Sequence, residues 1–199
     1  MKQPSLSEPD SVTVAKILTG AFHGDPFFRW LFPGQSHETC LRKWWEFLSL
    51  HSGENPKCAL SCDRDESSAS IWTKPIHDSI DRDPHDEQND FIDLMYELVN
   101  DRISQVLEAF SEVNANHPQE PHWYLQAVGT IPQMQGKGRA AKLLQPILEI
   151  CDSEGVGAYL ESTNPRNISF YYRLGFEIKK ELVLDAGQAA LTCMWREPV

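Results

Sequence analysis

The spacing of apolar residues predicts alternating helices and strands, most clearly in the second half of the chain. Apolar side chains that recur every three or four residues predict helices, and these are expected at residues 11–22, 38–50, 88–114, 138–154 and 167–174. Short apolar runs between turn-forming residues predict strands, at residues 58–62, 68–72, 122–130, 158–162, 177–184 and 189–196. From residue 122 onward, strands and helices alternate before a final pair of strands, an order typical of an α/β fold.

Single residues refine these elements. Ser11 is the expected cap of the first helix, and Pro146 is expected to kink the helix that contains it. The aromatic segment between Asp25 and Pro33 predicts a loop or a short helix. A polar loop is expected over residues 76–87.

Length and composition indicate one ordinary globular domain. The chain has 199 residues, of which 41% are hydrophobic and 24% charged. Residues 1–10 are expected to form a disordered tail, and residues 11–199 a single domain. No apolar run is long enough to span a membrane, and the first residues lack the apolar core of an export signal, so we expect a cytoplasmic protein that does not bind membranes.

The five cysteines are odd in number and scattered, which argues against a disulfide framework. Cys58 and Cys62 lie close together, but no second pair or neighbouring histidine follows them. We therefore expect no metal site.

The net charge of -11 disfavours nucleic acid as a partner and favours a cationic substrate such as an amine. Between Asp78 and Asp101 there are nine acidic residues against one basic residue, Arg82. This acidic stretch either forms a solvent-exposed face or attracts a cationic acceptor. Between Gln135 and Lys142 the balance reverses to three bases and no acid, as a local anion site would require.

The segment that carries this reversal contains Gly136 and Gly138, between a predicted strand and a predicted helix. Glycines let the backbone turn so that successive N–H groups and the first turn of the helix point at one anion. A P-loop would need Ser or Thr after its Gly-Lys pair, and it is absent. A dinucleotide fingerprint accepts Ala141 in place of its third glycine, but the acid expected about 20 residues further on is not in place, and the preceding strand is not the first of the domain. The pattern Gln/Arg-x-x-Gly-x-Gly/Ala remains, matched by Gln135, Gly138 and Ala140. The alternative is a plain turn with a solvated lysine.

Further motifs follow in a specific order: Glu120-Pro121-His122-Trp123-Tyr124-Leu125, Gln135-Gly136-Lys137-Gly138, Pro165-Arg166-Asn167, Phe170-Tyr171 and Arg173-Leu174-Gly175-Phe176. From about Gln119 to Pro198 the chain resembles the GCN5-related N-acetyltransferase (GNAT) superfamily, and within it puromycin N-acetyltransferase-like members. The resemblance implies an α/β fold with a mixed, mostly antiparallel sheet of six to seven strands, flanked by helices. It also implies that two central parallel strands, 122–130 and 158–162, splay apart around acetyl-CoA.

The resemblance assigns the cofactor site residue by residue. Backbone groups of Val128, Gly129 and Thr130 are expected to pair with the pantetheine arm. The pyrophosphate is expected on the backbone of the loop after Gln135, formed by Gly136, Lys137, Gly138, Arg139, Ala140 and Ala141. Asn167, and second to it Asn164, is expected to touch the cofactor. Arg139 replaces a common aliphatic residue, and either a phosphate contact or helix packing would explain it.

The same resemblance makes Tyr171 the proton donor to the leaving thiolate. A neutral phenol, with a pKa of about 10, can give a proton and a hydrogen bond where negative charge develops. The alternative for Tyr171 is a packed aromatic side chain. Glu161 is the first candidate for the base that accepts the amine proton, and its alternative is a strand carboxylate bonded to backbone. His122, expected to be exposed at the start of its strand, is a weaker candidate.

The acceptor site is the least defined. Phe27, Phe28, Trp30 and Trp72 are candidates to line it, with core packing as the alternative. The expected activity is acetyl transfer to the primary amine of a small molecule, by a monomer or homodimer. A regulatory module that binds CoA without turnover, and an acetyltransferase of protein N-termini or lysines, remain as alternatives.

Overall fold

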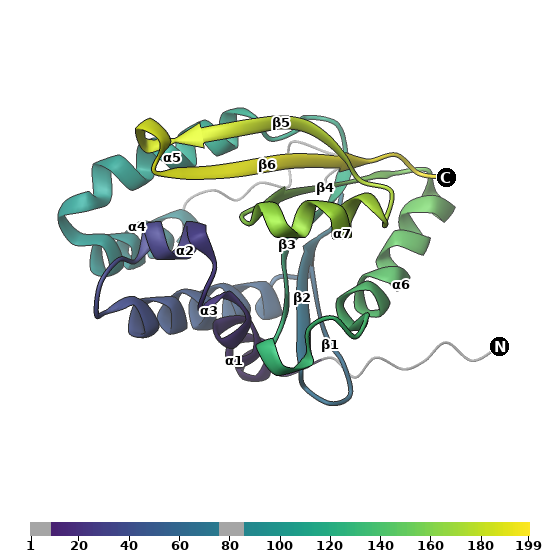
Figure 1. Ribbon diagram of the computed structural model, residues 1–199, viewed down its shortest axis with the longest axis horizontal. Helices are drawn as coiled ribbons and strands as arrows, with labels where there is room; N and C mark the ends of the chain where they lie inside the picture. Colours follow the sequence, from purple (N-terminus) through teal and green to yellow (C-terminus); the bar gives the residue numbers. More distant parts are fainter. Residues whose placement is uncertain (1–8, 76–85) are drawn as a thin grey trace.

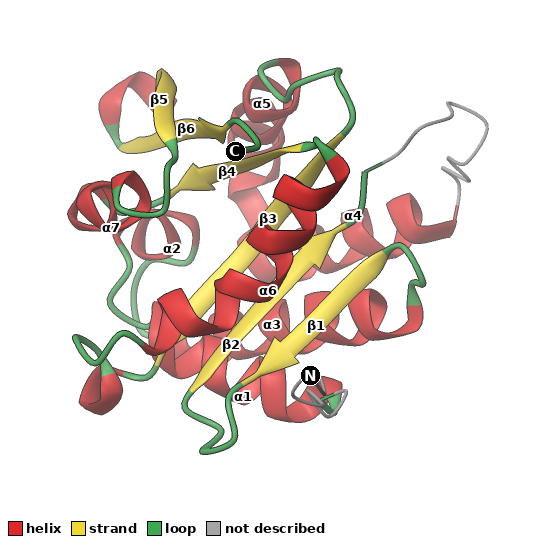
Figure 2. Ribbon diagram, turned by 90° about the vertical axis from the view of Figure 1, so that its right-hand side faces the viewer, coloured by secondary structure: helices red, strands yellow, loops and turns green. Residues whose placement is uncertain are grey.

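The computed structural model of the protein describes residues 9–75 and 86–199, which form a six-stranded sheet with helices on both faces (Figures 1 and 2). The strands are β1 Cys58–Cys62, β2 Ser68–Thr73, β3 His122–Thr130, β4 Gly157–Ser162, β5 Glu177–Leu184 and β6 Ala189–Arg196. Their order in the sheet is β1-β2-β3-β4-β6-β5. Only β3 and β4 pair in parallel, and every other pair is antiparallel. The predicted mixed, mostly antiparallel α/β sheet is confirmed.

Helices cover the two faces unequally. The helices are α1 Ser11–Phe22, α2 Pro26–Leu31, α3 His37–Glu54, α4 Asp86–Val99, α5 Ile103–Ala115, α6 Arg139–Glu154 and α7 Ile168–Tyr172. Figure 2 shows α6 in front of the sheet, with α1, α3 and α4 behind it. The β-strand alternation sends neighbouring side chains to opposite faces. Ile71 and Tyr159 accordingly join the core under α1, α2 and α3, whereas Trp72 and Leu160 join the core under α6 and α7.

The centre of the sheet opens between β3 and β4. The two strands pair only from His122 to Tyr124 and from Gly157 to Tyr159, and beyond these residues no ladder joins them. On its other side β3 carries a bulge, because Ile71 pairs with Ala127 and Trp72 with Leu125, which leaves Gln126 as an extra residue. The predicted separation of the two parallel strands is thus present, and it produces a V-shaped opening.

Several predicted details are wrong. The first helix is capped by Asp10, whose Oδ1 accepts the N–H of Val12 at 2.9 Å, and Ser11 is already inside the helix. The single helix expected over 88–114 is two helices, α4 and α5, joined by a short 3-10 turn. Asn100 starts this turn with a left-handed φ of 49°, a conformation that asparagine tolerates better than most residues and that an α-helix cannot contain.

Two further expectations concern α2 and α6. The aromatic segment after Asp25 forms the helix α2, and α6 is one continuous helix that contains Pro146. Most of the expected tail and of the polar loop over 76–87 lies outside the described residues. No helix among the described residues is both long and apolar enough to cross a membrane.

Candidate active site

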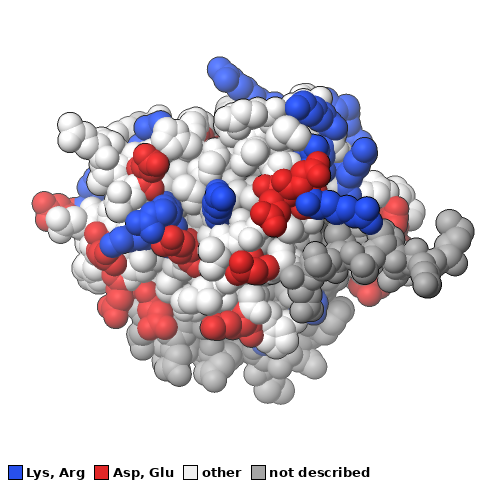
Figure 3. Space-filling model, turned by 90° about the horizontal axis from the view of Figure 1, so that it is seen from below, with Lys and Arg blue, Asp and Glu red and all other residues white. Residues whose placement is uncertain are grey.

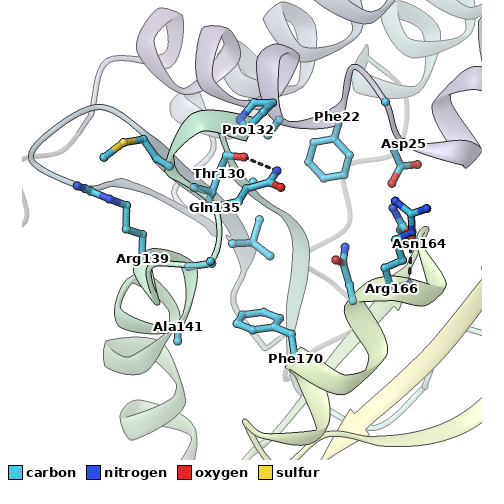
Figure 4. A pocket seen from close by; sticks show the side chains of 18 of the residues that line it. Phe22, Asp25, Thr130, Pro132, Gln135, Arg139, Ala141, Asn164, Arg166 and Phe170 are labelled. Carbon is cyan, nitrogen blue, oxygen red and sulfur yellow. Dashed lines mark hydrogen bonds between the residues drawn. The ribbon is translucent and has the colours of Figure 1, made fainter.

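A cleft of about 900 Å³ lies at the open end of the V between β3 and β4. Four segments line it: the end of α1 with the loop to α2, the end of β3, the loop into α6, and the region from Asn164 to Arg173. Figure 4 shows Thr130, Gln135 and Arg139 on one side of this cleft, and Asn164 and Arg166 on the other. The strand separation therefore supplies a groove between two walls that are far apart in the sequence.

The glycine loop forms one wall through its backbone. Gly136 and Gly138 have φ values of 72° and 71°, which an L-residue adopts only with strain. The Gln135 side chain closes the loop by donating from Nε2 to the Thr130 carbonyl at 3.0 Å. The first N–H after the loop that finds a partner is that of Lys142, which donates to the Gly138 carbonyl at 3.2 Å. The N–H groups before it are the unpaired donors of a helix N-terminus, the arrangement that binds phosphate.

The basic side chains of this loop do not point at that anion site. Arg139 donates to Asp63 at 2.6 Å and forms a second ion pair with Asp65 at 2.8 Å. Both carboxylates belong to the turn between β1 and β2, so the guanidinium ties this turn to the start of α6. Lys137 directs its ammonium to the Gln133 carbonyl, and it is absent from the lining of the cleft, unlike the other residues predicted for the cofactor.

The end of β3 lies on the same side of the cleft as the glycine loop, and Val128, Gly129 and Thr130, the residues predicted to pair with the pantetheine arm, all line the cleft. A Cβ at Gly129 would lie 2.6 Å from the Cβ of Ala21, so only glycine allows α1 to pack this closely. The Thr130 hydroxyl lies 2.9 Å from that of Ser68 and is buried. Gly129 therefore has no side chain over its backbone at the cleft, and Thr130 keeps its hydroxyl in the protein.

Tyr171 also lines the cleft, and its side chain is 7% exposed. Its ring packs edge-on against Phe170 and Phe176. Burial raises the pKa of the Tyr171 phenol above its usual value, and the charge of Asp25 raises it further. The next residue, Tyr172, is 51% exposed and lies outside the cleft lining.

Asp25 is a lining residue that the sequence analysis did not select. It is 6% exposed and caps α2, because its Oδ1 accepts the N–H groups of Phe27 and Phe28 at 3.0 and 3.4 Å. Its Oδ2 accepts the Thr163 hydroxyl at 2.7 Å, which joins α2 to the end of β4. Burial raises the pKa of Asp25 despite these bonds. The Asp-Pro pair that begins a helix is the signal that could have marked it.

The far wall of the cleft contains both predicted asparagines. Asn164 and Asn167 line it, and the Asn164 Oδ1 accepts the backbone N–H of Arg166 at 3.1 Å. Arg166 and Arg173 line the cleft as well, although neither was predicted. This wall thus adds two cationic side chains to the lining of the groove.

The two candidate bases lie elsewhere. Glu161 does not line the cleft, its side chain is 8% exposed, and its Oε1 lies 3.5 Å from Nδ1 of His117. His122 was expected to be exposed, which is wrong: it is 9% exposed because the rings of His117, Tyr159 and Trp195 pack around it. Both residues belong to one buried polar cluster next to the V.

The four aromatic residues proposed for the acceptor site are core residues. Phe27, Phe28 and Trp30 are 6%, 4% and 9% exposed and pack in the core beneath α1 and α3, because the apolar face of α2 must be buried. Trp72 is fully buried in the other core, on the side of α6. None of the four lines the described cleft.

This geometry agrees with comparisons to known proteins. The model of the acetyltransferase (GNAT) family matches residues 59–176, more than half of the chain. The chain belongs to the GNAT family. Enzymes of this family use acetyl-CoA as the acetyl donor. Free amides at the start of α6, and a glycine loop whose backbone lacks covering side chains, suit the pyrophosphate of this cofactor.

The relatives extend this picture. An uncharacterized N-acetyltransferase of Schizosaccharomyces pombe is 42% identical over 78 residues, which are 38% of this chain and 32% of that protein. This chain thus matches about a third of that relative. Among solved structures, a Corynebacterium glutamicum protein described as histone acetyltransferase HPA2 and related acetyltransferase has a TM-score of 0.67 at 22% identity, covering 99% and 95% of the two chains.

Two other solved structures share the fold at lower identity. Arylalkylamine N-acetyltransferase 2 of Aedes aegypti has a TM-score of 0.63 at 15% identity over 94% of each chain. The PaiA N-acetyltransferase of Thermoplasma acidophilum, solved with coenzyme A, has a TM-score of 0.56 at 14% identity over 98% and 96% of the chains. At such identities these structures establish the fold.

Proposed function

We propose that the protein transfers the acetyl group of acetyl-CoA to the primary amine of a small cationic molecule. The observation that carries this proposal is Tyr171, a buried phenol that lines the same cleft as the free amides of the glycine loop. One cleft thus combines an anion site for the cofactor with a proton donor. Both are needed for acyl transfer from a thioester.

Each part of the cleft has a defined task in this proposal. The bound thioester supplies the acetyl group, and a thiolate leaves when the amine attacks. The amides of residues 136–141 hold the pyrophosphate, while the backbone of Val128, Gly129 and Thr130 pairs with the pantetheine arm. Asn164 and Asn167 contact the cofactor from the opposite wall. Tyr171 gives its hydrogen to the departing sulfur. Glu161, which is buried beside the V and not in the cleft lining, accepts the proton of the amine.

The raised pKa of Tyr171 suits this task. A phenol that stays protonated at every working pH always offers a hydrogen bond to the developing negative charge. The amine has the opposite requirement, since it must be neutral to attack. For a lysine-like amine with a pKa near 10.4, deprotonation at pH 7 costs about 4–5 kcal/mol, which a nearby carboxylate offsets in part.

Charge supports a cationic acceptor. The net charge is -11, and acidic and basic side chains are interspersed on the face shown in Figure 3. Asp25, which caps α2, places a buried carboxylate in the cleft wall. Two solved relatives are named for arylalkylamines and for the formation of N-acetylagmatine, both of which are amine chemistry. The resemblance to puromycin N-acetyltransferase-like members agrees with a small amine.

A thiol-release assay tests the proposal. Purified protein is mixed with acetyl-CoA and a panel of polyamines, arylalkylamines, aminonucleosides and lysine-containing peptides, and free CoA thiol is followed with a chromogenic disulfide. We expect saturable release with at least one small amine and none with acids or alcohols. Calorimetry with CoA alone measures cofactor binding separately.

Two results would replace the proposal. Micromolar CoA binding without thiol release for any amine would identify a CoA-binding module. Release only with peptides would identify a protein acetyltransferase.

A further inference from the structure

A buried polar cluster lies next to the V on the face of the sheet that α6 and α7 do not cover. It consists of His117, His122, Tyr124, Tyr159, Glu161 and Cys193. Tyr159 and Cys193 belong to the core under α1 and α2. Glu161 points to the same side, because it is two residues from Tyr159 along β4 and contacts His117.

Hydrogen bonding fixes where the protons of the two histidines lie. Nδ1 of His122 is 2.7 Å from the Glu120 carbonyl, which only accepts, so this nitrogen carries the hydrogen. Burial lowers the pKa of His122, the Glu120 carbonyl bond opposes this, and the charge of His117 lowers it further, so the ring is neutral. Its Nε2 therefore has a lone pair, which faces Nε2 of His117 at 3.1 Å. Nε2 of His117 must then be the donor of that bond.

Because Nε2 of His117 carries the hydrogen that it donates to His122, Nδ1 is the nitrogen that faces Glu161. When His117 is neutral and Glu161 is ionised, a lone pair of Nδ1 faces a lone pair of Oε1 across 3.5 Å. The Glu161 Oε1 is buried and has no hydrogen-bond partner among the described residues. An unpaired buried acceptor is costly, and a single proton placed between the two atoms would satisfy both.

The cluster has a defined position relative to the reaction. Glu161 lies two residues beyond the last residue of β4 that pairs with β3, so it borders the apex of the V. Tyr171 belongs to the core on the opposite face, under α6 and α7. A proton acceptor and the proposed proton donor thus lie on opposite sides of the strand opening.

We propose that Glu161 and His117 act as one proton acceptor for the acceptor amine, with His122 as the positioning residue that sets the tautomer of His117. This inference rests on the proposed acetyl transfer. The amine nitrogen forms the bond to the acetyl carbon as the carbon–sulfur bond breaks, and its proton passes to the pair. The Tyr171 hydrogen goes to the sulfur. His117, whose side chain is 30% exposed, then releases the proton of the pair to water, and water restores the hydrogen of Tyr171.

The other groups around Glu161 do not compete for this proton. Burial raises the pKa of Tyr124 and of Tyr159, and the charge of Glu161 adds to both effects. Burial also raises the pKa of the Cys193 thiol, a hydrogen bond with Tyr159 opposes this, and the charge of Glu161 adds to the rise. All three therefore stay protonated near neutral pH. No group of His, Cys, Asp and Glu within the described residues is arranged to hold a metal ion.

The chain offers a matched control for a test of His117. His51 has the same 30% exposure, lies 3.9 Å from the Asp90 carboxylate and bonds the Phe47 carbonyl through Nδ1, but it has no contact with Glu161. We compare His117→Asn, whose amide keeps polar atoms near the position of Nδ1 but does not titrate, with His51→Asn. For His117→Asn we expect kcat at pH 7 to fall about tenfold or more and the acid limb of the kcat–pH profile to be lost, with the Kd for CoA unchanged. His51→Asn should leave all three unchanged, and a His117→Asn profile identical to wild type would overturn the proposal.

A second measurement needs no turnover. The ¹⁵N shifts of the histidine rings should give the Nδ1–H form for His122 and a hydrogen on Nε2 for His117. Glu161→Gln should change the ¹⁵N shift of His117 Nδ1, because the carboxylate oxygen that lies 3.5 Å from this nitrogen is replaced by an uncharged amide. The opposite tautomers, or an unchanged Nδ1 shift of His117 in Glu161→Gln, would overturn the pairing even if acetyl transfer is established. Absence of turnover with any amine would instead refute the proposed function while these shifts still test the pair.

Discussion

At the level of single residues, Tyr171 and Tyr172 are neighbours in the chain with opposite environments. Tyr171 is 7% exposed in the cleft wall, and Tyr172 is 51% exposed outside it. Tyr171→Phe keeps the ring that packs against Phe170 and Phe176 but removes the hydroxyl. We expect turnover to fall about 100-fold or more, with little change in the Kd for CoA, as measured by thiol release and calorimetry.

Tyr172→Phe is the matched control and should retain wild-type turnover. If Tyr171→Phe kept its turnover as well, the phenol would have no part in the reaction, and its role would be packing alone.

Tyr171 could be selected from the sequence because its distance from the Gly-Phe pair is a local property. Asp25 and His117 could not, because their importance depends on partners that folding brings from elsewhere. Asp25 accepts a hydrogen bond from Thr163, which follows β4, and His117 contacts Glu161, which belongs to β4. His122 illustrates the same difficulty, since three aromatic rings bury a residue whose position at the start of a strand predicted exposure.

Among the elements, the start of α6 is stabilised by a contact that no local pattern could predict. Arg139 lies 76 positions after Asp63 in the chain, yet the two form a 2.6 Å ion pair. Burial opposes ionisation of Asp63, but hydrogen bonds from Ser67 and from Arg139 outweigh it and lower its pKa. The sequence left a phosphate contact and helix packing as explanations of Arg139, and the ion pairs add a third, the fixing of the β1–β2 turn.

This assignment makes a paired prediction about cofactor affinity. Arg139→Leu should change the Kd for CoA by less than about threefold, because both carboxylates already neutralise its guanidinium. Arg166→Leu should raise the Kd about tenfold, as expected for losing one charge-assisted hydrogen bond, since Arg166 has no ion-pair partner among the described residues. Calorimetry measures both, and a larger loss for Arg139→Leu than for Arg166→Leu would show that Arg139 binds phosphate.

Element boundaries show the same division between local and distant causes. The strands and α1, α6 and α7 were predicted to within a few residues because apolar periodicity is local. The break between α4 and α5 was missed, since the apolar stripe continues across it and only the backbone of Asn100 departs from a helix.

For the whole molecule, the family resemblance predicted the fold. It also predicted the V-shaped opening, because the separation of two parallel strands is a property of the family's sheet. The sequence pattern alone predicted α/β, without the order of the strands. Which polar groups the sheet would bury was not predictable, because burial depends on how both layers of helices close over it.

That burial has a consequence for stability at high pH. Burial raises the pKa of three tyrosines, Tyr124, Tyr159 and Tyr171, in the folded state. Below about pH 10 they are protonated in both the folded and the unfolded state, so they make no difference to pH dependence there. Above about pH 10 the unfolded chain releases these protons while the folded protein retains them, and each tyrosine then lowers the free energy of unfolding by about 1.4 kcal/mol per pH unit.

Urea unfolding between pH 8 and pH 11 measures this effect. We expect the contribution of these tyrosines to the free energy of unfolding to stay constant up to about pH 10. Above this pH the free energy of unfolding should fall steeply. In Tyr171→Phe about one proton fewer should be released on unfolding above pH 10, because one buried phenol is missing. The free energy of unfolding should therefore fall less steeply with pH. Tyr96→Phe, at a side chain that is 56% exposed, should leave the slope unchanged. Equal slopes in wild type and Tyr171→Phe would mean that the Tyr171 phenol ionises as easily in the folded protein as in the unfolded chain, which a phenol enclosed by Phe170 and Phe176 should not do.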